Sequence, residues 1–178
     1  AALGYSQQSG IPYGIGFLKN KYIGRTFIQP NQKLRENTVH IKLNPISDTV
    51  KDKRVVLVDD SIVRGTTSKQ IVQMLREAGA KEVHFLSSAP EFLYPCYFGV
   101  DIDSRKHLSA ANHTMEEMRR ILGVDSLGFL SVEGVGKIAE GCGLGVCTGC
   151  FTGKYPIDPP AHREKSKFEH KLSENSND

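Results

Sequence analysis

The chain has none of the features that mark membrane, secreted or nucleic-acid-binding proteins. No apolar run approaches the ~18 residues that a membrane-spanning helix needs. No charged segment followed by a short apolar one marks a secretion signal. Neither sign of charge dominates, because 23 Lys and Arg stand against 20 Asp and Glu. This balance disfavours a protein held mainly by phosphate backbones or anionic membranes. We therefore expect a cytoplasmic protein that binds neither nucleic acid nor membranes.

Cysteine is scarce and unevenly placed. Cys142, Cys147 and Cys150 lie close together near the C-terminus, and Cys96 lies far upstream. A chain of 178 residues can bury a core without disulfide bonds. A metal site, a cluster or a redox site therefore fits these cysteines better than structural disulfides do.

Residues 51–88 have the clearest structural pattern. The β-branched run Val55–Val58 is typical of a strand buried on both faces of a parallel sheet. A helix with one apolar face is expected to follow and to close at Gly79. The next strand is expected at Val83–Leu86. This order predicts an α/β fold built on a right-handed crossover, with ligands at the carboxyl ends of the strands.

Weaker patterns suggest the remaining elements. The first residues read like the inside of a helix closed by Gly4 or Gly10, which suggests that the chain begins within a domain. Residues 31–50 suggest a polar helix or loop. Thr114 and Glu117 form a capping-box pattern for a helix that ends at Gly123. A short strand over 126–131 and a helix over 132–140 complete the list of expected elements.

The loop after the first predicted strand has the chemistry of a sugar-phosphate site. Adjacent carboxylates at Asp59 and Asp60 cost free energy at the end of a buried strand unless a divalent cation or sugar hydroxyls compensate. Gly65, Thr66 and Thr67 open the next helix, where free N–H groups and two hydroxyls suit one phosphate. Taken singly, Asp60 or Thr66 is more simply a turn or helix cap. The whole string favours a ligand site.

The string Val58–Thr67 resembles the phosphoribosylpyrophosphate signature of type I phosphoribosyltransferases. It is not a Walker A loop, because no Gly-Lys-Thr/Ser occurs. In type I phosphoribosyltransferases the two acids contact ribose hydroxyls or bound magnesium, and the loop holds the 5′-phosphate. The resemblance implies a type I phosphoribosyltransferase fold, with a mainly parallel sheet flanked by helices, and a Mg²⁺ site at the acid pair. The implied substrate-binding residues are Asp59, Asp60, Ser61, Arg64, Gly65, Thr66 and Thr67.

Three segments together narrow the resemblance. Lys19–Ile28, Val58–Thr67 and Cys147–Pro156 are similar, in this order, to motifs of the glutamine phosphoribosylpyrophosphate amidotransferase family, over about residues 1–156. These glycosyltransferases make 5-phosphoribosylamine and pyrophosphate from phosphoribosylpyrophosphate and glutamine-derived ammonia, the first committed step of purine synthesis. The resemblance also implies inhibitory purine nucleotides and a homo-oligomer.

The same resemblance implies roles for the N-terminal motif and for the rest of the enzyme. Residues 19–27 would belong to a mobile loop that closes over the substrate and excludes water. Its implied catalytic residues are Lys19, Tyr22, Arg25 and Thr26. The family also has a glutaminase domain led by a nucleophilic cysteine, which this sequence does not contain. We therefore expect the C-terminal part of such an enzyme, incomplete at its N-terminus.

The cysteines allow two iron–sulfur ligand sets. Cys142, Cys147 and Cys150 have the spacing of plant-type ferredoxins, with Cys96 as a distant fourth ligand. The resemblance instead implies the iron–sulfur branch of the family. There a [4Fe–4S] cluster is held by Cys96, Cys147, Cys150 and a cysteine upstream of this chain. We favour the second set, and zinc remains a weaker option.

These expectations divide the chain into three parts. Residues 1–125 would form the C-terminal part of a phosphoribosyltransferase domain, 126–158 a cluster-binding segment, and 159–178 a polar, disordered tail. Three other functions remain open: a salvage phosphoribosyltransferase, a non-catalytic regulator with the same fold, and an electron-transfer iron–sulfur protein. Iron binding would argue against the first, the weak net charge of +3 argues against the second, and the acid–phosphate loop argues against the third.

Overall fold

The centre of the fold is a three-stranded parallel sheet. The computed structural model describes residues 1–20, 43–100, 102, 104–143 and 145–159. The strands β3 (Arg54–Asp59), β4 (Glu82–Ser87) and β5 (Ser126–Phe129) lie in the order β3-β4-β5. Val55 is opposite Val83 and Phe85 is opposite Leu127 in the parallel register. The predicted α/β class and the predicted crossover from β3 to β4 are confirmed.

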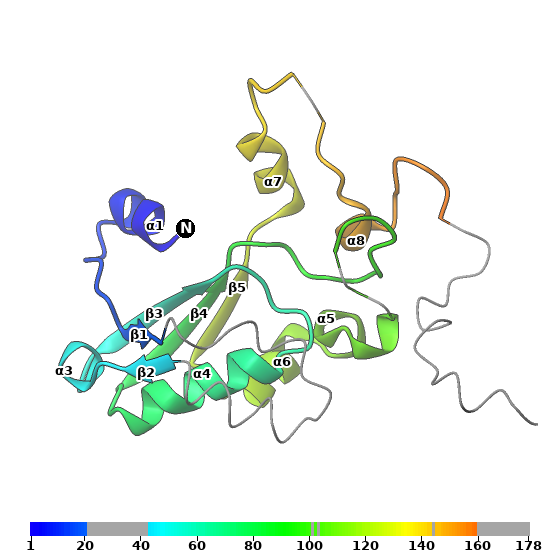
Figure 1. Ribbon diagram of the computed structural model, residues 1–178. Coiled ribbons are helices and arrows are strands. Elements are labelled where there is room, and N and C mark those ends of the chain that lie inside the picture. The colour runs from blue at the N-terminus through cyan, green and yellow to red at the C-terminus, as the bar shows by residue number, and fades with distance from the viewer. Residues whose placement is uncertain (21–42, 101, 103, 144, 160–178) are drawn as a thin grey trace, which may run out of the picture.

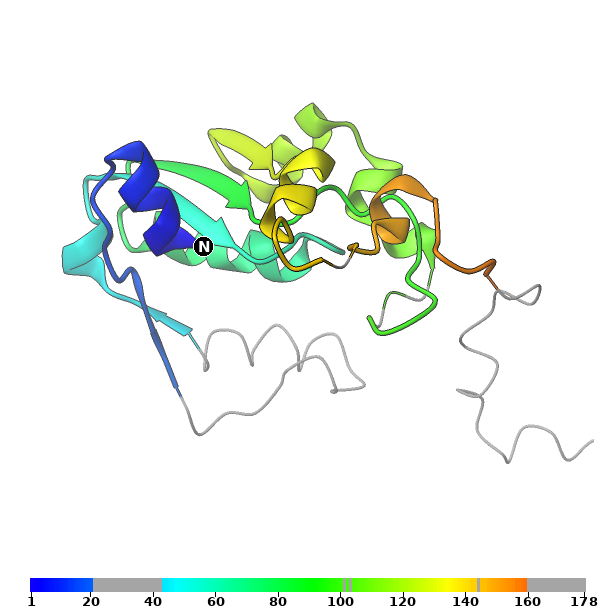
Figure 2. The same ribbon diagram turned by 90° about the horizontal axis from the view of Figure 1, so that it is seen from above.

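Two helices cover one face of this sheet. Helix α4 (Thr66–Glu77) connects β3 to β4, and α6 (Met115–Leu122) lies between β4 and β5 in the chain. Both pack below the sheet in Figure 1, whereas α1 (Ala2–Ser9) and α7 (Val132–Ile138) lie on the other side. Figure 2, seen from above, shows α1 and α7 in front of the strands.

The main core lies between the sheet and these two helices. Alternate residues of β4 are buried, as expected for a strand with one face against a core. Val83 and Phe85 have no exposed surface and pack with Leu75 of α4 and with Met118 and Leu122 of α6. This packing holds the carboxyl ends of β3 and β4 and the start of α4 in fixed positions.

Strand β3 is less buried than its sequence predicts. Val55 and Leu57 pack against the main core. Val56 and Val58 point to the opposite face and belong to no buried cluster among the described residues. The prediction of burial on both faces is therefore wrong for the part of the chain that the structure describes, because α4 and α6 pack on only one face.

A short antiparallel pair flanks the sheet. Strands β1 (Phe17–Lys19) and β2 (Leu43–Pro45) pair with Phe17 opposite Pro45. The expectation of a polar helix or loop over 31–50 missed the strand β2, whereas the short helix α3 (Ser47–Val50) lies within that range. Phe17 and Leu43 also contact the buried pair Ile71 and Met74 of α4, which ties β1 and β2 to that helix.

Several local predictions are confirmed by backbone geometry. Helix α1 ends at Gly10, whose φ of 75° lies in the left-handed region. The capping box of α6 is present, with Thr114 and Glu117 bonded in both directions. The remaining short elements are η2 (Arg105–His107), α5 (Ser109–Asn112) and α8 (Gly149–Thr152). Among the described residues, no helix has the length and hydropathy to span a bilayer.

Candidate functional site

The acid pair lies at the carboxyl end of β3. Asp59 is the last residue of the strand and is opposite Ser87 of β4. Ser88 donates from both its N–H and its hydroxyl to the Asp59 carbonyl oxygen, at 2.9 and 2.8 Å. The Asp60 N–H donates to Asp59 Oδ1 at 2.9 Å. These bonds fix where the strand ends and where the two carboxylates lie.

The two carboxylates have different surroundings. Asp60 is exposed, whereas Asp59 is half-buried. Burial is the main cause that raises the pKa of Asp59. The Asp60 N–H bond lowers this pKa, and the negative charge of Asp60 raises it again. A carboxylate that is partly desolvated beside a second negative charge favours a cation or hydroxyl ligand that compensates both effects.

The loop after the acid pair is anchored at its centre. Ile62 is only 1% exposed and belongs to the main core. The Ser109 N–H donates to the Val63 carbonyl oxygen at 2.8 Å, which joins the loop to the start of α5. Gly65 has a φ of 77°, a left-handed conformation that side chains rarely adopt. The loop is therefore a formed turn with a glycine where its backbone requires one.

Helix α4 begins directly after this turn, and no side chain of the described residues caps its first N–H groups. Gly65 is the N-cap residue and supplies no side-chain hydrogen bond, and the first turn closes through Lys69 N–H to the Gly65 carbonyl at 2.9 Å. The simpler reading of Thr66 as the N-cap is therefore wrong. The free N–H groups and the hydroxyls of Thr66 and Thr67 are available to an anion.

The predicted substrate residues therefore fall on one continuous stretch of structure, and of the predicted catalytic residues only Lys19 is described. Asp59, Asp60, Ser61, Arg64, Gly65, Thr66 and Thr67 run from the end of β3 to the first turn of α4. Ser61 donates to Asp60 Oδ1 at 3.3 Å. Lys19 is exposed at the end of β1. Tyr22, Arg25 and Thr26 lie outside the described residues, as does the tail from 160 onward.

The cysteine segment docks on the loop that follows β4. The N–H groups of Leu93 and Tyr94 both donate to the Cys150 carbonyl at 3.0 Å. Cys96 and Cys150 pack together against a buried cluster of Phe92, Ile102 and Leu108. Helix α8 (orange) lies beside this loop (green) in both ribbon views (Figures 1 and 2). The segments around Cys96 and Cys150, which are far apart in the sequence, thus meet in one region, which we call the cysteine patch.

The Cys150 thiol is influenced by two of the other thiols. Burial is the main cause that raises the pKa of Cys150 to about 11, and the nearby Cys96 and Cys147 thiols raise it further. Cys142 is exposed and is not among these causes. Within the described ranges, no group of three or more His, Cys, Asp or Glu side chains is arranged to hold a metal ion. The thiols share a patch without forming a complete ligand set there.

Two tyrosines that the sequence analysis did not single out hold this patch together. A Cβ at Gly149 would overlap the Tyr155 ring, and one at Gly153 would lie 3.0 Å from Tyr94 Cζ. The Tyr155 hydroxyl donates to the Pro95 carbonyl at 2.6 Å. The sequence signal for this packing was a glycine within the C-x₂-C motif, a second glycine after it, and one tyrosine on each of the two docked segments. Rings can pack directly on backbone that has no Cβ.

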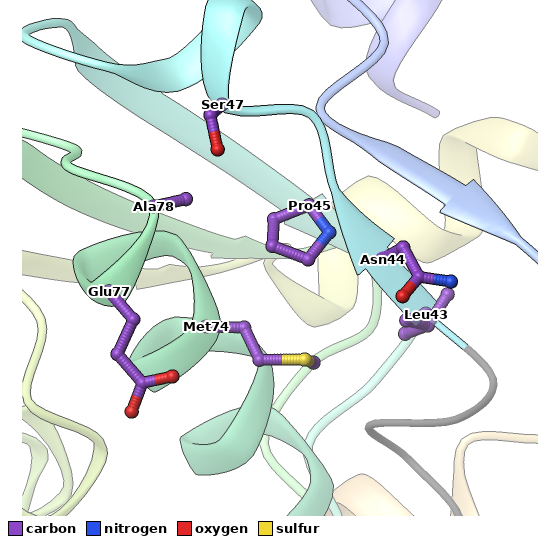
Figure 3. Close-up of a pocket in the computed structure, with 7 residues that line it drawn as sticks. All are labelled: Leu43, Asn44, Pro45, Ser47, Met74, Glu77 and Ala78. Carbon is purple, nitrogen blue, oxygen red and sulfur yellow. The ribbon is translucent and has the colours of Figure 1, made fainter.

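Figure 3 shows a small cavity at the other end of α4. It measures about 270 Å³ and lies between β2 and the last turn of the helix. Met74 points into it beside Leu43 and Pro45, and Glu77 lies at its edge. We call the stretch from the acid pair to the start of α4, residues 59–67, the phosphate turn. None of these residues lines the cavity, so the two are separate. The cavity therefore contributes no residue to the candidate site at the acid pair and the start of α4.

Known proteins match this arrangement over most of the chain. Residues 6–90 match the phosphoribosyl transferase domain model. Amidophosphoribosyltransferases from Archaeoglobus fulgidus and Bacillus subtilis are 54% and 52% identical over 162 residues, which is 90% and 89% of this chain. The chain belongs to the amidophosphoribosyltransferase family. It spans about a third of the length of these relatives, 35% and 34%.

Solved structures agree with this assignment. A glutamine phosphoribosylpyrophosphate amidotransferase from B. subtilis, in complex with ADP and GMP, has a TM-score of 0.76 and 51% identity, and the match covers 91% of this chain and 36% of that one. A structure described as the allosteric regulatory enzyme of purine biosynthesis has a TM-score of 0.77 and 50% identity, covering 90% and 36%. The predicted fold class and family are confirmed. The division into domains, the site residues and the iron–sulfur branch stay predictions.

Proposed function

We propose that this amidophosphoribosyltransferase chain supplies the phosphoribosyl half of the reaction. Ammonia released from glutamine would attack C1 of phosphoribosylpyrophosphate, the bond from C1 to the pyrophosphate oxygen would break, and the nitrogen would lose a proton. The products are 5-phosphoribosylamine and pyrophosphate. The proposal covers the activity of a longer enzyme, of which the chain spans about a third by comparison with its relatives.

One observation supports this proposal above the others. A half-buried carboxylate at the end of β3 and the uncapped start of α4 are joined by a single anchored turn, residues 61–65. Such a turn would hold the ribose hydroxyls at one end and the 5′-phosphate at the other. The residues needed here position a substrate, and none has to act as a nucleophile.

The mechanism then divides between the acid pair, the phosphate turn and the N-terminal motif. Asp59 and Asp60 would hold Mg²⁺, which supplies charge neutralisation for the leaving pyrophosphate. Thr66, Thr67 and the N–H groups of α4 would orient the 5′-phosphate, with Ser61 and Arg64 contributing beside them. Positive charge that develops on the ribose during bond cleavage would lie near the acid pair, which stabilises it.

The N-terminal motif would complete the site. Lys19, Tyr22, Arg25 and Thr26 would close over the substrate, with the two cations near the pyrophosphate. Only Lys19 of this set is described, and it is exposed at the end of β1. From that position, a closing segment would reduce the water around the reacting carbon.

The same phosphate turn suits regulatory nucleotides. The B. subtilis relative was solved with ADP and GMP. Purine nucleotides carry a 5′-phosphate, so we propose that they inhibit this enzyme by occupying the turn that holds the substrate phosphate. We also propose a cytoplasmic homo-oligomer, on the ground of the family alone.

The acid pair is the direct test of the proposed activity. Replacing Asp59→Asn together with Asp60→Asn in the intact protein should weaken binding of Mg²⁺-phosphoribosylpyrophosphate by about 3 kcal/mol or more, since contacts to charged groups contribute about 1.5–3 kcal/mol each. Calorimetry measures the change. Asp48→Asn, which neutralises an acid in α3, is the matched control. A folded double variant with unchanged affinity would remove the acid pair from the site.

The cysteine patch supports a second, separate proposal. We propose that Cys96, Cys147 and Cys150 hold a [4Fe–4S] cluster with a fourth ligand from outside this chain. The support is that Cys96 and Cys150 pack against the same buried cluster and that Cys96 and Cys147, but not Cys142, are among the causes that raise the pKa of Cys150. Docking of α8 on residues 93–94 brings the two cysteine segments together.

Four single variants test this ligand assignment. In anaerobically purified intact protein, Cys96→Ser, Cys147→Ser and Cys150→Ser should each lose the iron, whereas Cys142→Ser should keep about four irons per chain. Iron analysis and the visible absorption of the cluster measure the result. Equal loss in Cys142→Ser would instead support the four-cysteine set within this chain. Zinc in place of iron in the wild type would overturn the cluster and leave the phosphoribosyl proposal untouched.

A further inference from the structure

A cavity beside the cysteine patch is unused by the proposed reaction. It measures about 640 Å³ and lies between the loop after β4, the η2 turn and the segment after α8. This volume lies within the range of small-molecule sites in proteins. None of residues 59–67 lines the cavity, so it is separate from the phosphate turn.

The wall of the cavity combines aromatic rings with charged side chains. Tyr94, Tyr97 and Tyr155 supply the rings. Arg105 and Lys154 supply two positive charges, and neither forms an ion pair with any residue that the structure describes. Asp158 supplies one negative charge, so the lining has a net positive charge.

Arg105 is held in place before any ligand arrives. Its guanidinium lies 5.3 Å from the centroid of the Tyr94 ring, a cation–π contact. Asn112 Nδ2 donates to the Arg105 carbonyl at 2.9 Å and to the Leu108 carbonyl at 2.7 Å, which fixes the η2 turn to α5. A cation that is already ordered loses little conformational entropy when it binds an anion.

The aromatic wall is ordered in the same way. The Tyr94 ring lies against the Gly153 backbone. Tyr97 and Tyr155 meet edge to face with centroids 5.1 Å apart, and the Tyr155 hydroxyl is bonded to the Pro95 carbonyl. The rings therefore form a fixed apolar surface beside two cations. That combination suits a ligand with a flat ring and an anionic group.

We propose that this cavity binds a small aromatic anion, with Arg105 and Lys154 holding its carboxylate or phosphate and the tyrosine wall holding its ring. The site goes beyond the phosphoribosyl reaction and depends on neither Mg²⁺ nor an iron–sulfur cluster. Asp158 repels the anionic group and thereby orients it toward the two cations.

Four probes separate the two parts of this recognition in the intact protein. Benzoate and phenyl phosphate carry both a ring and an anion, inorganic phosphate lacks the ring, and benzyl alcohol lacks the charge. Ligand-observed NMR should show saturable binding of the two aromatic anions and weaker binding of the other two. Benzoate is the main probe, because a carboxylate on a ring does not resemble the sugar phosphate of the other site. Inorganic phosphate that binds as tightly as phenyl phosphate at this site would overturn the aromatic class.

Charge variants locate the binding. Arg105→Gln and Lys154→Gln should each weaken benzoate binding about fivefold, and Asp158→Asn should strengthen it. Lys106→Gln, a cation of the same turn that does not line the cavity, should leave it unchanged. If Arg105→Gln unfolds the turn, Lys154→Gln still decides, since Lys154 makes no ion pair among the described residues. Unchanged affinity in Lys154→Gln, or no saturable benzoate binding to wild type, would overturn the proposal.

Discussion

The phosphate turn and the cysteine patch are held in place by different means. The turn lies between a parallel strand pair and a 12-residue helix whose side chains fill the main core. In its described residues the cysteine segment has one helix, the 4-residue α8, and it is held by two hydrogen bonds to Cys150 and by rings on glycine backbone. The first site is positioned by regular structure and the second by contacts between distant segments. A single side chain should therefore matter more for the structure of the second.

The largest effect in this comparison should be on ligand binding at the phosphate turn. Thr66→Val together with Thr67→Val removes two hydroxyls that would bond a charged phosphate. This change should weaken ribose 5-phosphate binding by about 3 kcal/mol, taking about 1.5 kcal/mol for each bond to a charged group. The fold should hold, because the main core positions α4. Calorimetry against ribose 5-phosphate and free ribose measures the difference.

Two observations serve as controls for this change. Thr152→Val, an equivalent substitution in α8, should leave ribose 5-phosphate binding at its wild-type level. Free ribose should bind the Thr66 and Thr67 double variant as it binds the wild type. Equal loss for ribose and ribose 5-phosphate would mean that these threonines do not bind a phosphate.

Most of the structure around the phosphate turn could be predicted from the sequence. The run Val55–Val58, the periodicity of α4 and the capping box of α6 depend on neighbouring residues, so they can be read along the chain. Strand β2 could not be predicted, because Asn44 and Pro45 are atypical of strands and its pairing with β1 crosses a long connection. Patterns of neighbouring residues predict elements, and they do not predict which elements touch.

The cysteine patch shows even more clearly that the sequence does not predict which segments touch. The spacing of Cys147 and Cys150 predicted a shared site but not what holds it. The packing of Tyr94 on Gly153 and the hydrogen bond from Tyr155 to Pro95 join segments about 60 residues apart, whereas Tyr155 packs on Gly149 within its own segment. A glycine signals only that a side chain is absent. What fills the space is decided by the tertiary fold.

A change at Gly149 should produce the intermediate effect and should be specific to the cysteine patch. Gly149→Ala places a Cβ into the Tyr155 ring, so the ring must move, and this weakens the hydrogen bond from Tyr155 to Pro95 that joins the two cysteine segments. The free energy of local opening should fall by about 2 kcal/mol, within the range of overpacking changes. Hydrogen exchange of the Leu93 and Tyr94 amides measures it.

Two other glycines test whether the regions differ as argued. Gly128→Ala in β5 meets Leu86 Cδ2 at 2.9 Å, the end of a half-buried side chain that can rotate, and should cost less than about 1.5 kcal/mol. Gly136→Ala in α7 meets no atom within 4 Å and should be neutral or stabilising. A larger cost at Gly128 than at Gly149 would contradict the difference between the two regions.

The smallest expected effect concerns the stability cost of the acid pair itself. Burial, with a further contribution from the Asp60 charge, raises the pKa of Asp59 above its ordinary value. A carboxyl whose pKa is raised by folding favours the folded state when protonated, so its ionisation reduces stability as the pH rises through that range. Asp59→Asn keeps an oxygen that accepts the Asp60 N–H and removes the charge. At neutral pH without ligand, this variant should be more stable by roughly 0.5 kcal/mol, a small value because solvent screens a half-buried group.

The pH dependence decides between a charge effect and a packing effect. The stability gained by Asp59→Asn should be fully present at neutral pH and should disappear as the pH falls below the ordinary range of carboxyl groups, where Asp59 is protonated in both states. Denaturant unfolding of wild type and variant at several pH values measures this. Asp60→Asn should give a smaller gain, because it removes only the neighbouring charge. A gain that persists at acid pH would mean that the amide packs better than the carboxyl group. A loss at neutral pH would mean that the ionised carboxylate contributes to the fold even without a ligand.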